Sequence, residues 1–267
     1  MRFSSYLPLI SIAALSTMSA AQSNPTFLFT PGAWHLPGVF DSVRADLSRR
    51  GYDSAAVKLV SVDPTDPKTQ GVAADAAAVR GELEKLVDQG KEVVMVCHSY
   101  GGVPTASAVE GMNLADRTAR GEKGGVAMMV YLTSFAIPAR TGLSDGLGGV
   151  TPDWWNITGD IVTPKDPIRI FYADVPPSIA ATAVSNIKPM SLRSTSDKST
   201  FAPWTQGFKM GYIFAEDDQA IALPVQQGMA SQFPEGSFTA SLKSSHSPFL
   251  SMPDQLAEVL VQAATAS

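Results

Sequence analysis

The stretch VMVCHSYGG carries three reactive side chains in a row: the thiol of Cys97, the imidazole of His98 and the hydroxyl of Ser99. An apolar run precedes them and glycines follow, which predicts a strand, a sharp turn and a helix. Successive side chains of a strand point to opposite faces, so Cys97 and His98 are not expected to pair. A serine at the apex of such a turn presents its hydroxyl to a substrate, which makes Ser99 the candidate nucleophile. The alternative is that Ser99 is an ordinary turn residue.

The residues two positions either side of Ser99 must be small, because a sharp turn presses them against neighbouring backbone. Gly101 meets this need on one side, and Cys97 takes the other, where glycine is commonest. We therefore interpret Cys97, the single cysteine of the chain, as a structural residue rather than a reactive thiol.

A serine nucleophile needs a general base, and the chain has three histidines. His98 precedes Ser99 on the predicted strand and should point away from it. His35 lies in the loop after the first predicted strand, where it could contact a substrate or lie at the surface. His246 lies in the loop SSHSPF before the last predicted helix, and a loop there can reach Ser99. We therefore predict His246 as the base; the alternative is an exposed loop histidine.

The base needs a carboxylate that fixes its tautomer and stabilises the imidazolium. Glu216, Asp217 and Asp218 come directly after a predicted strand. The order serine, acid, histidine along the chain is the one expected for a nucleophile in a strand–turn–helix. From the residues alone any one of the three serves, and the other two are solvated loop charges.

Acyl transfer also needs two backbone N–H groups that bind the oxyanion. One comes from the residue after the nucleophile, which is Tyr100. The other comes from the loop after an early strand, which predicts Ala33 in TPGAWH. Gly32 lets that backbone approach closely.

Strands and helices alternate along the part of the chain that must position these residues. Apolar runs predict strands over 26–29, 54–60, 92–97, 125–132, 209–215 and 237–242, and periodic stretches predict helices over 39–51, 70–89, 103–112 and 253–264. Strands that are apolar throughout, with helices between them, are typical of a parallel sheet covered on both faces. The predicted fold class is therefore α/β, with a mostly parallel sheet.

The alternation breaks between about residues 136 and 204. This segment contains many prolines, a helix-like stretch over 178–187 and no clear strand, so we predict an inserted helical cap. Trp34, His35, Trp154 and Trp155 are the candidate substrate-binding residues, and they favour an apolar substrate. The alternative is that these aromatic residues form the hydrophobic underside of the cap.

The composition restricts the partners. The net charge of −5 disfavours nucleic acid. The chain shows no histidine-rich cluster and no dinucleotide glycine fingerprint, so we expect neither a metal nor an organic cofactor. A small molecule is the expected partner, no membrane span is predicted, and the oligomeric state stays open.

The N-terminus has the features of a secretory signal peptide over residues 1–21. Arg2 is followed by an apolar run from Leu7 to Met18, and small residues precede a cleavage site before Gln22. We therefore expect a secreted chain with one hydrolase domain over 22–267. Asn156, in the sequon NIT, is then a candidate glycosylation site that should be exposed.

The motifs resemble those of the α/β-hydrolase superfamily, in particular the compact group of methylesterases and hydroxynitrile lyases. PGAWH is similar to the group's HGAWH loop, VCHSYGG to its elbow, EDDQAI to its acid loop and SSHSPFLSMPDQL to its histidine loop, while FYADVPP resembles a cap segment of microbial members. The resemblance spans almost the whole chain after the leader and implies an α/β-hydrolase fold. It also implies that the acid is Asp218, which completes Ser99, Asp218 and His246.

The chain departs from the group at several positions. Pro31 replaces a histidine of the oxyanion loop, and Thr133 and Ser134 replace an Asp-Ala pair after the fourth strand. Ser247 follows His246 at the position where the lyases carry lysine, which favours a hydrolase over a lyase.

We therefore predict a secreted serine hydrolase that cleaves a carboxylic ester or lactone through an acyl-enzyme. One alternative is cleavage of a carbon–carbon bond, as in a diketone hydrolase or a hydroxynitrile lyase. The other is a binding protein that keeps the fold with little turnover.

Overall fold

The structure is a computed structural model that describes Met1 and residues 24–266. Residues 2–21 of the predicted signal peptide lie outside the described residues. In the described part, no helix combines the length and apolar character that crossing a membrane requires.

Six strands form one sheet in the order β2-β1-β3-β4-β8-β9, and each neighbouring pair is parallel. The strands are β1 (Thr26–Thr30), β2 (Ser54–Ala56), β3 (Glu92–Ser99), β4 (Gly125–Ser134), β8 (Met210–Ala215) and β9 (Phe238–Leu242). The central strands β3 and β4 are buried along nearly their whole length, which is why they read as unbroken apolar runs. This arrangement confirms the predicted α/β fold class.

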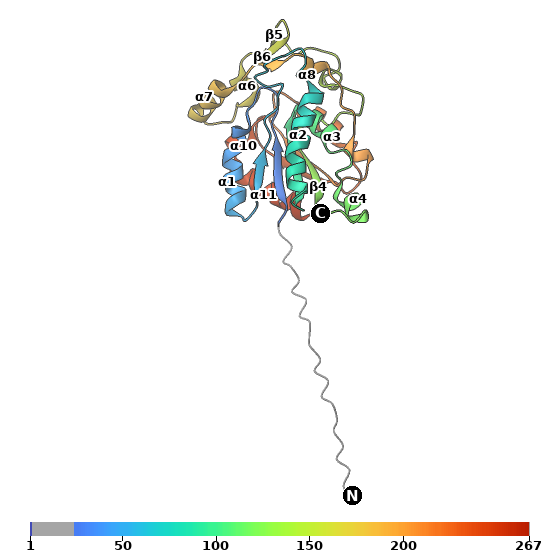
Figure 1. Ribbon diagram of the computed structural model, residues 1–267. Helices are drawn as coiled ribbons and strands as arrows, with labels where there is room; N and C mark the ends of the chain where they lie inside the picture. The colour runs from blue at the N-terminus through green and yellow to red at the C-terminus, as the bar shows by residue number, and fades with distance from the viewer. Residues whose placement is uncertain (2–23, 267) are drawn as a thin grey trace.

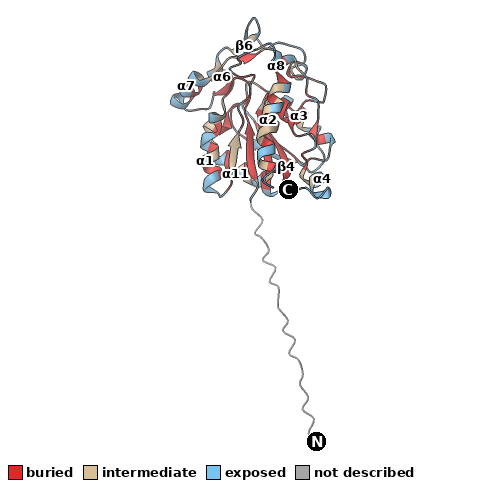
Figure 2. Cartoon of the chain, in the orientation of Figure 1, coloured by how far each residue is buried: buried red, intermediate tan, exposed pale blue. Residues whose placement is uncertain are grey.

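Helices cover both faces of the sheet (Figure 1). Val94 and Val96 of β3 pack in one hydrophobic cluster with α1 (Asp41–Arg49) and α11 (Pro253–Thr265), while Met95 and Cys97 pack in a second cluster. That second cluster includes α2 (Val72–Val87) and α3 (Gly102–Ala108). Buried strands lie between partly exposed helices in Figure 2. The alternation of β3 side chains between two cores therefore fixes which face Cys97 and His98 occupy.

Four further short elements belong to the core domain. They are η1 (Pro37–Phe40), α4 (Leu114–Ala119), α9 (Leu223–Ala230) and α10 (Pro248–Ser251). Helices α4 and α9 were not predicted, because they are short and carry few buried residues. The strand predicted over 54–60 ends at Ala56: Val57 and Leu59 stay buried, although they lie beyond the paired segment.

The segment between β4 and β8 covers the carboxyl ends of the strands (Figure 1). It contains α5 (Leu143–Gly146), β5 (Trp155–Thr158), β6 (Ile161–Pro164), α6 (Pro167–Phe171), α7 (Pro177–Asn186), β7 (Met190–Ser191), α8 (Arg193–Ser196) and η2 (Pro203–Thr205). We call residues 136–204 the cap. The prediction of a purely helical cap was wrong, since β5, β6 and β7 form an antiparallel sheet. These strands have two to four residues and β5 is mostly exposed, so they carry no clear alternation.

Candidate active site

Strand β3 ends at Ser99, whose backbone lies in the left-handed region with φ 53°. The turn brings the backbone of Gly101 against the carbonyls of Pro31 and Thr30: a Cβ on Gly101 would lie 2.5 Å and 2.7 Å from their oxygens. The amide of Phe135 and the hydroxyl of Ser134 both donate to the carbonyl oxygen of Ser99. A left-handed serine costs about 1–2 kcal/mol, so these contacts are what hold it in place.

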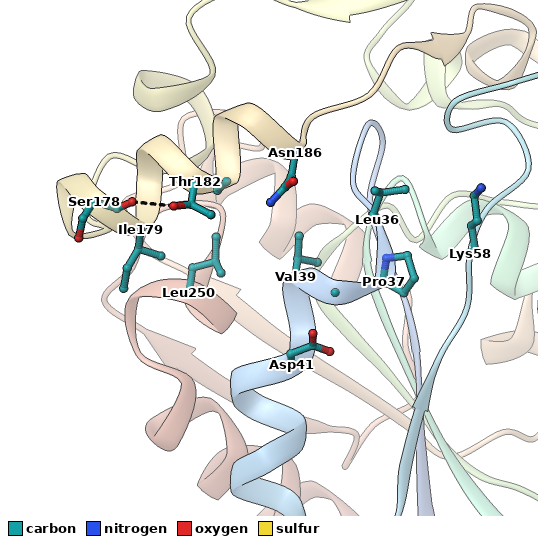
Figure 3. Close-up of a pocket in the computed structure, with 12 residues that line it drawn as sticks. Leu36, Pro37, Val39, Asp41, Lys58, Ser178, Ile179, Thr182, Asn186 and Leu250 are labelled. Atoms are coloured by element: carbon teal, nitrogen blue, oxygen red, sulfur yellow. Dashed lines mark hydrogen bonds between the residues drawn. The ribbon is translucent and has the colours of Figure 1, made fainter.

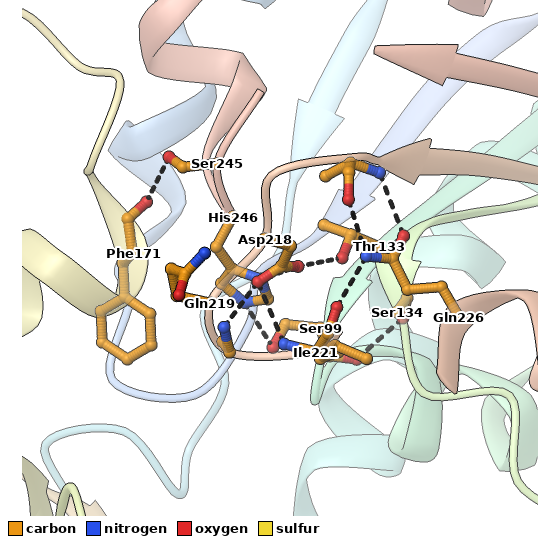
Figure 4. Close-up of polar contacts among 12 residues, drawn as sticks. Ser99, Thr133, Ser134, Phe171, Asp218, Gln219, Ile221, Gln226, Ser245 and His246 are labelled. Carbon is orange, nitrogen blue, oxygen red and sulfur yellow. Dashed lines mark hydrogen bonds and ion pairs between the residues drawn. The ribbon is translucent and has the colours of Figure 1, made fainter. Parts of the chain in front are cut away.

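Ser99 and His246 are hydrogen-bonded across 147 residues of sequence (Figure 4). His246 Nε2 lies 2.9 Å from Ser99 Oγ, and His246 Nδ1 lies 2.7 Å from Oδ2 of Asp218. A carboxylate only accepts, so Nδ1 carries the hydrogen and Nε2 is left to accept from the serine hydroxyl. The three side chains therefore form one directed chain from Ser99 to Asp218.

Asp218 is the buried member of the acidic run. It is 5% exposed, whereas Glu216 and Asp217 are exposed. The amides of Ala220 and Ile221 donate to its Oδ1 at 2.7 Å and 3.0 Å, and the hydroxyl of Thr133 donates to its Oδ2. Together with Nδ1 of His246, these groups make four donors that orient the carboxylate of Asp218.

Cys97 and His98 lie on opposite faces of β3, as the strand period requires. Cys97 is buried and its thiol donates to the carbonyl of Val130; burial raises the pKa of this thiol well above its ordinary value. The ring of His98 donates from Nε2 to the carbonyl of His246 at 2.9 Å. Burial holds the pKa of His98 well below its ordinary value, so the ring is neutral. His98 therefore supports the backbone of His246 and does not reach Ser99.

The two amides predicted to bind an oxyanion are those of Ala33 and Tyr100. Both residues line the same small cavity as Ser99. Among the residues that the structure describes, neither amide donates a hydrogen bond. Free, buried N–H groups beside a nucleophile can stabilise a negative charge that develops there.

The cavity beside Ser99 is small and mostly apolar. Its volume is about 20 Å³, enough for one water molecule. The wall comes from the loop after β1, the turns after β3 and β4, the cap and the loop after β8. It comprises Ala33, Trp34, Tyr100, Phe135, Leu143, Leu147, Trp154, Trp155, Phe171, Ala220 and Ile221. A substrate larger than a water molecule therefore needs additional room beside Ser99, which a movement of the cap or of its side chains would provide.

Residues 27–259 match the sequence profile of the Alpha/beta hydrolase family. The chain belongs to the α/β-hydrolase family. A curated relative from Aspergillus novofumigatus, the α/β hydrolase nvfD, is 28% identical over 245 residues, which cover 90% of this chain and 96% of the relative. The pyrethroid hydrolase of Sphingobium wenxiniae is 24% identical over 259 residues, covering 88% of this chain and 86% of the relative. These similarities identify the chain as an enzyme of the hydrolase family.

Solved structures of hydrolases share the fold of this α/β hydrolase. A crystal structure of a pyrethroid hydrolase superposes with a TM-score of 0.71 at 22% identity, covering 91% of this chain and 98% of that one. A methylesterase from Arabidopsis gives a TM-score of 0.70 at 20% identity, covering 90% and 99%. The similarity to the family that the motifs indicated is thus confirmed at the level of the fold.

Three of the four candidate substrate-binding residues line the cavity of this α/β hydrolase: Trp34, Trp154 and Trp155. The fourth, His35, does not, which corrects that expectation. Its ring is buried within the same loop as Ala33, with Nδ1 2.6 Å from the carbonyl oxygen of Ala33 and Nε2 2.7 Å from the hydroxyl of Tyr172. Two short hydrogen bonds inside the protein leave this histidine no group for a substrate.

Several wall residues were not predicted. Phe135 follows β4 directly, and Ala220 and Ile221 follow Asp218. Their place at the carboxyl ends of parallel strands was the available signal, because ligands of open α/β sheets bind there. Leu143 and Leu147 of the cap carried no such signal.

A larger groove of about 840 Å³ lies on the outside of the α/β hydrolase, where α7 faces η1 and α10 (Figure 3). Ile179 and Thr182 of α7 lie opposite Val39 and Leu250. None of the residues that surround Ser99 lines this groove, so size alone does not identify the reaction site. Within residues 24–266, no group of three or more His, Cys, Asp or Glu side chains is arranged to hold a metal ion.

Proposed function

We propose that this enzyme hydrolyses a carboxylic ester or lactone through an acyl-enzyme on Ser99. The observation that carries the proposal is the directed chain Ser99–His246–Asp218, with distances of 2.9 Å and 2.7 Å, placed beside two free amides. A nucleophile, a base that faces it, an acid that orients the base and an oxyanion site are the four parts that acyl transfer requires.

Acylation begins when the Ser99 hydroxyl gives its proton to Nε2 of His246 and its oxygen attacks the ester carbonyl. The carbonyl oxygen becomes negative and is held by the amides of Ala33 and Tyr100. The carboxylate of Asp218 stabilises the imidazolium of His246. The imidazolium then protonates the leaving alkoxide, the carbon–oxygen bond breaks, and the acyl group remains on Ser99.

Deacylation repeats these steps with water. His246 accepts a proton from a water molecule, whose oxygen attacks the acyl carbonyl. The second oxyanion is held by the same two amides. The bond between Ser99 Oγ and the acyl carbon then breaks, and His246 gives its proton to Ser99 Oγ. The products are a carboxylic acid and an alcohol, or a hydroxy acid when the substrate is a lactone.

The substrate that the cavity favours is small and apolar near the scissile bond. Its wall is dominated by aromatic and aliphatic side chains, among them Trp34, Trp154 and Phe171. The names of relatives, a pyrethroid hydrolase and a methylesterase, support an ester as the substrate class. Ser247 is buried beside His246, at the position where lyases of the group carry a lysine, which weighs against cyanohydrin cleavage.

The proposal is tested by labelling and by a substrate panel. A fluorophosphonate probe should label the wild-type enzyme on Ser99 and leave Ser99→Ala unlabelled. A panel of p-nitrophenyl esters, aryl esters and lactones should yield acid and alcohol. Release of cyanide or of an aldehyde would overturn ester hydrolysis in favour of a lyase, and a wild type that is not labelled would indicate a binding protein.

We further propose that the chain is secreted and that its leader is removed before Gln22. The support is the pattern of residues 1–21, in which Arg2 and an apolar run precede small residues. Sequencing the N-terminus of protein recovered from the medium should read Gln22 first. Recovery of the full chain inside cells only would contradict the proposal.

A further inference from the structure

A short segment of the cap, residues 171–174, contacts both loops of the candidate active site. The ring of Phe171 lies 5.6 Å from that of His246, and its carbonyl accepts a hydrogen bond from Ser245 at 3.2 Å. The carboxylate of Asp174 accepts from the same hydroxyl, so the single hydrogen of Ser245 is shared between these two acceptors. On the other side, the hydroxyl of Tyr172 is bonded to His35. One segment therefore joins the histidine loop to the oxyanion loop.

The direction of the bonds through His35 follows from their ends. The carbonyl of Ala33 can only accept, so Nδ1 of His35 carries the hydrogen and donates to it. Nε2 of a neutral ring is then an acceptor, so the hydroxyl of Tyr172 must donate. His35 and Tyr172 are 3% and 1% exposed, which keeps water from replacing either partner. The hydrogen bonds therefore run in one direction only, from Tyr172 of the cap through His35 to the carbonyl of Ala33.

The same loop is tied to the cap at two further points. The indole of Trp34 donates to the carbonyl of Val162 at 2.9 Å, and the amide of Lys188 donates to the carbonyl of Trp34 at 3.0 Å. Trp34 has φ 65°, a conformation that a bulky residue keeps only when its surroundings hold it. The loop that presents the Ala33 amide thus depends on the cap for its shape.

We propose that Tyr172 and His35 are positioning residues, which hold the oxyanion loop so that the Ala33 amide meets the developing oxyanion only while the cap is closed. This inference rests on the proposed function. The cavity beside Ser99, of about 20 Å³, has room for no more than a water molecule, so a substrate needs space that the cap or its side chains must open. Closure would then complete the oxyanion site at the moment when the substrate is enclosed.

The test uses single-group changes in the full chain. Tyr172→Phe removes the hydroxyl that donates to His35, and His35→Asn keeps an amide near Ala33 while it breaks the link to Tyr172. The matched control is Tyr52→Phe: Tyr52 is buried in the turn between α1 and β2, packs against Phe27 and does not line the cavity. We measure kcat and KM for the best ester of the panel, normalised to the number of sites labelled by the fluorophosphonate.

Tyr172→Phe should lower kcat per labelled site about tenfold with KM within about twofold, because a displaced oxyanion donor acts on the transition state. Tyr52→Phe should match the wild type. Adding Tyr172→Phe to His35→Asn should cause no further loss of kcat per labelled site, because both residues act through the same hydrogen-bonded path to Ala33. A merely structural role would lower the labelled fraction and leave kcat per labelled site unchanged.

Unchanged kcat per site in Tyr172→Phe, or losses that multiply in the double variant, would overturn the inference while ester hydrolysis by the wild type stands. A wild type that neither hydrolyses esters nor takes the label would overturn the proposed function, and this inference with it.

Discussion

Nδ1 of His246 lies 2.7 Å from Oδ2 of Asp218, and both side chains are shielded from solvent. Asp217, the preceding residue, is exposed and its amide donates to the carbonyl of Ser244 instead. Asp218→Ala should therefore lower kcat about 10³- to 10⁴-fold, because the imidazolium of His246 loses its partner and the ring its orientation. Asp217→Ala is the matched control and should keep nearly full activity. Steady-state kinetics of the two variants decide the assignment; activity loss in the second only would reverse it.

Thr133 has a role that its sequence position did not indicate. Its hydroxyl donates to Oδ2 of Asp218, the oxygen that also faces His246. Thr133→Val keeps the shape of the side chain and removes this donor, so kcat should fall about ten- to a hundredfold. Thr182→Val is the control: Thr182 is exposed on α7, where its hydroxyl bonds to the carbonyl of Ser178. Equal kcat for the two variants would show that Asp218 does not need Thr133.

Position 101 requires glycine because neighbouring carbonyl groups lie too close to leave room for a side chain. A Cβ there would lie 2.5 Å, 2.7 Å and 2.9 Å from three carbonyl oxygens, those of Pro31, Thr30 and His98. Gly101→Ala should destabilise the fold by about 3 kcal/mol or more, since no flexible side chain can yield. Gly228→Ala, on the exposed face of α9 with nothing within 4 Å of the new Cβ, should instead stabilise by about 0.5–1 kcal/mol. Urea unfolding of both variants tests the contrast.

The elements that the sequence predicted well are those whose signal is local. Strands β3 and β4 are buried on both faces, so an apolar run marked each of them. Ser99 was recognisable because the glycines that its turn requires are its neighbours. His246 was predicted both by its position in the loop before the last helix and by elimination among three histidines.

What the sequence did not predict depends on contacts between distant residues. Thr133 and Asp218 are 85 residues apart, and His35 and Tyr172 are 137 apart. The spacing of residues in the sequence does not reveal hydrogen bonds between distant positions. His35 was therefore assigned to substrate binding, and Thr133 was noted only as a departure from the family pattern. The strands of the cap escaped prediction because Trp155–Thr158 is mostly exposed and follows no alternation.

Asn156 lies exposed in β5, on the outer side of the cap, as the sequon prediction required. In a host that glycosylates secreted proteins, Asn156 should therefore carry a glycan. The expected measurement is a mass shift of the peptide with Asn156 that disappears in Asn156→Gln, with kcat unchanged. An unmodified peptide in secreted material would contradict the prediction.

The histidines around the oxyanion loop predict a loss of stability in mild acid. Burial, the main cause, lowers the pKa of His35 to about 4 against the ordinary 6.5, and burial lowers the pKa of His98 in the same direction. Between pH 6.5 and pH 4 the unfolded chain therefore binds protons that the folded chain does not. The free energy of unfolding falls as the pH decreases over this range. From pH 7 to pH 5, His35 alone contributes a loss of about 2 kcal/mol.

His35→Asn removes one of these groups and should show a smaller decrease over the same range. At pH 7 it should be less stable than the wild type, because the bonds to Ala33 and Tyr172 are changed. As the pH falls from 7 to 5, this difference in the free energy of unfolding should narrow by about 2 kcal/mol. The reason is that only the wild type must keep a buried ring at position 35 neutral. Urea unfolding at pH 7, 6 and 5 measures the gap directly. A gap that stays constant would mean that His35 is protonated in the folded state at pH 5, and the directed chain from Tyr172 would then be wrong at that pH.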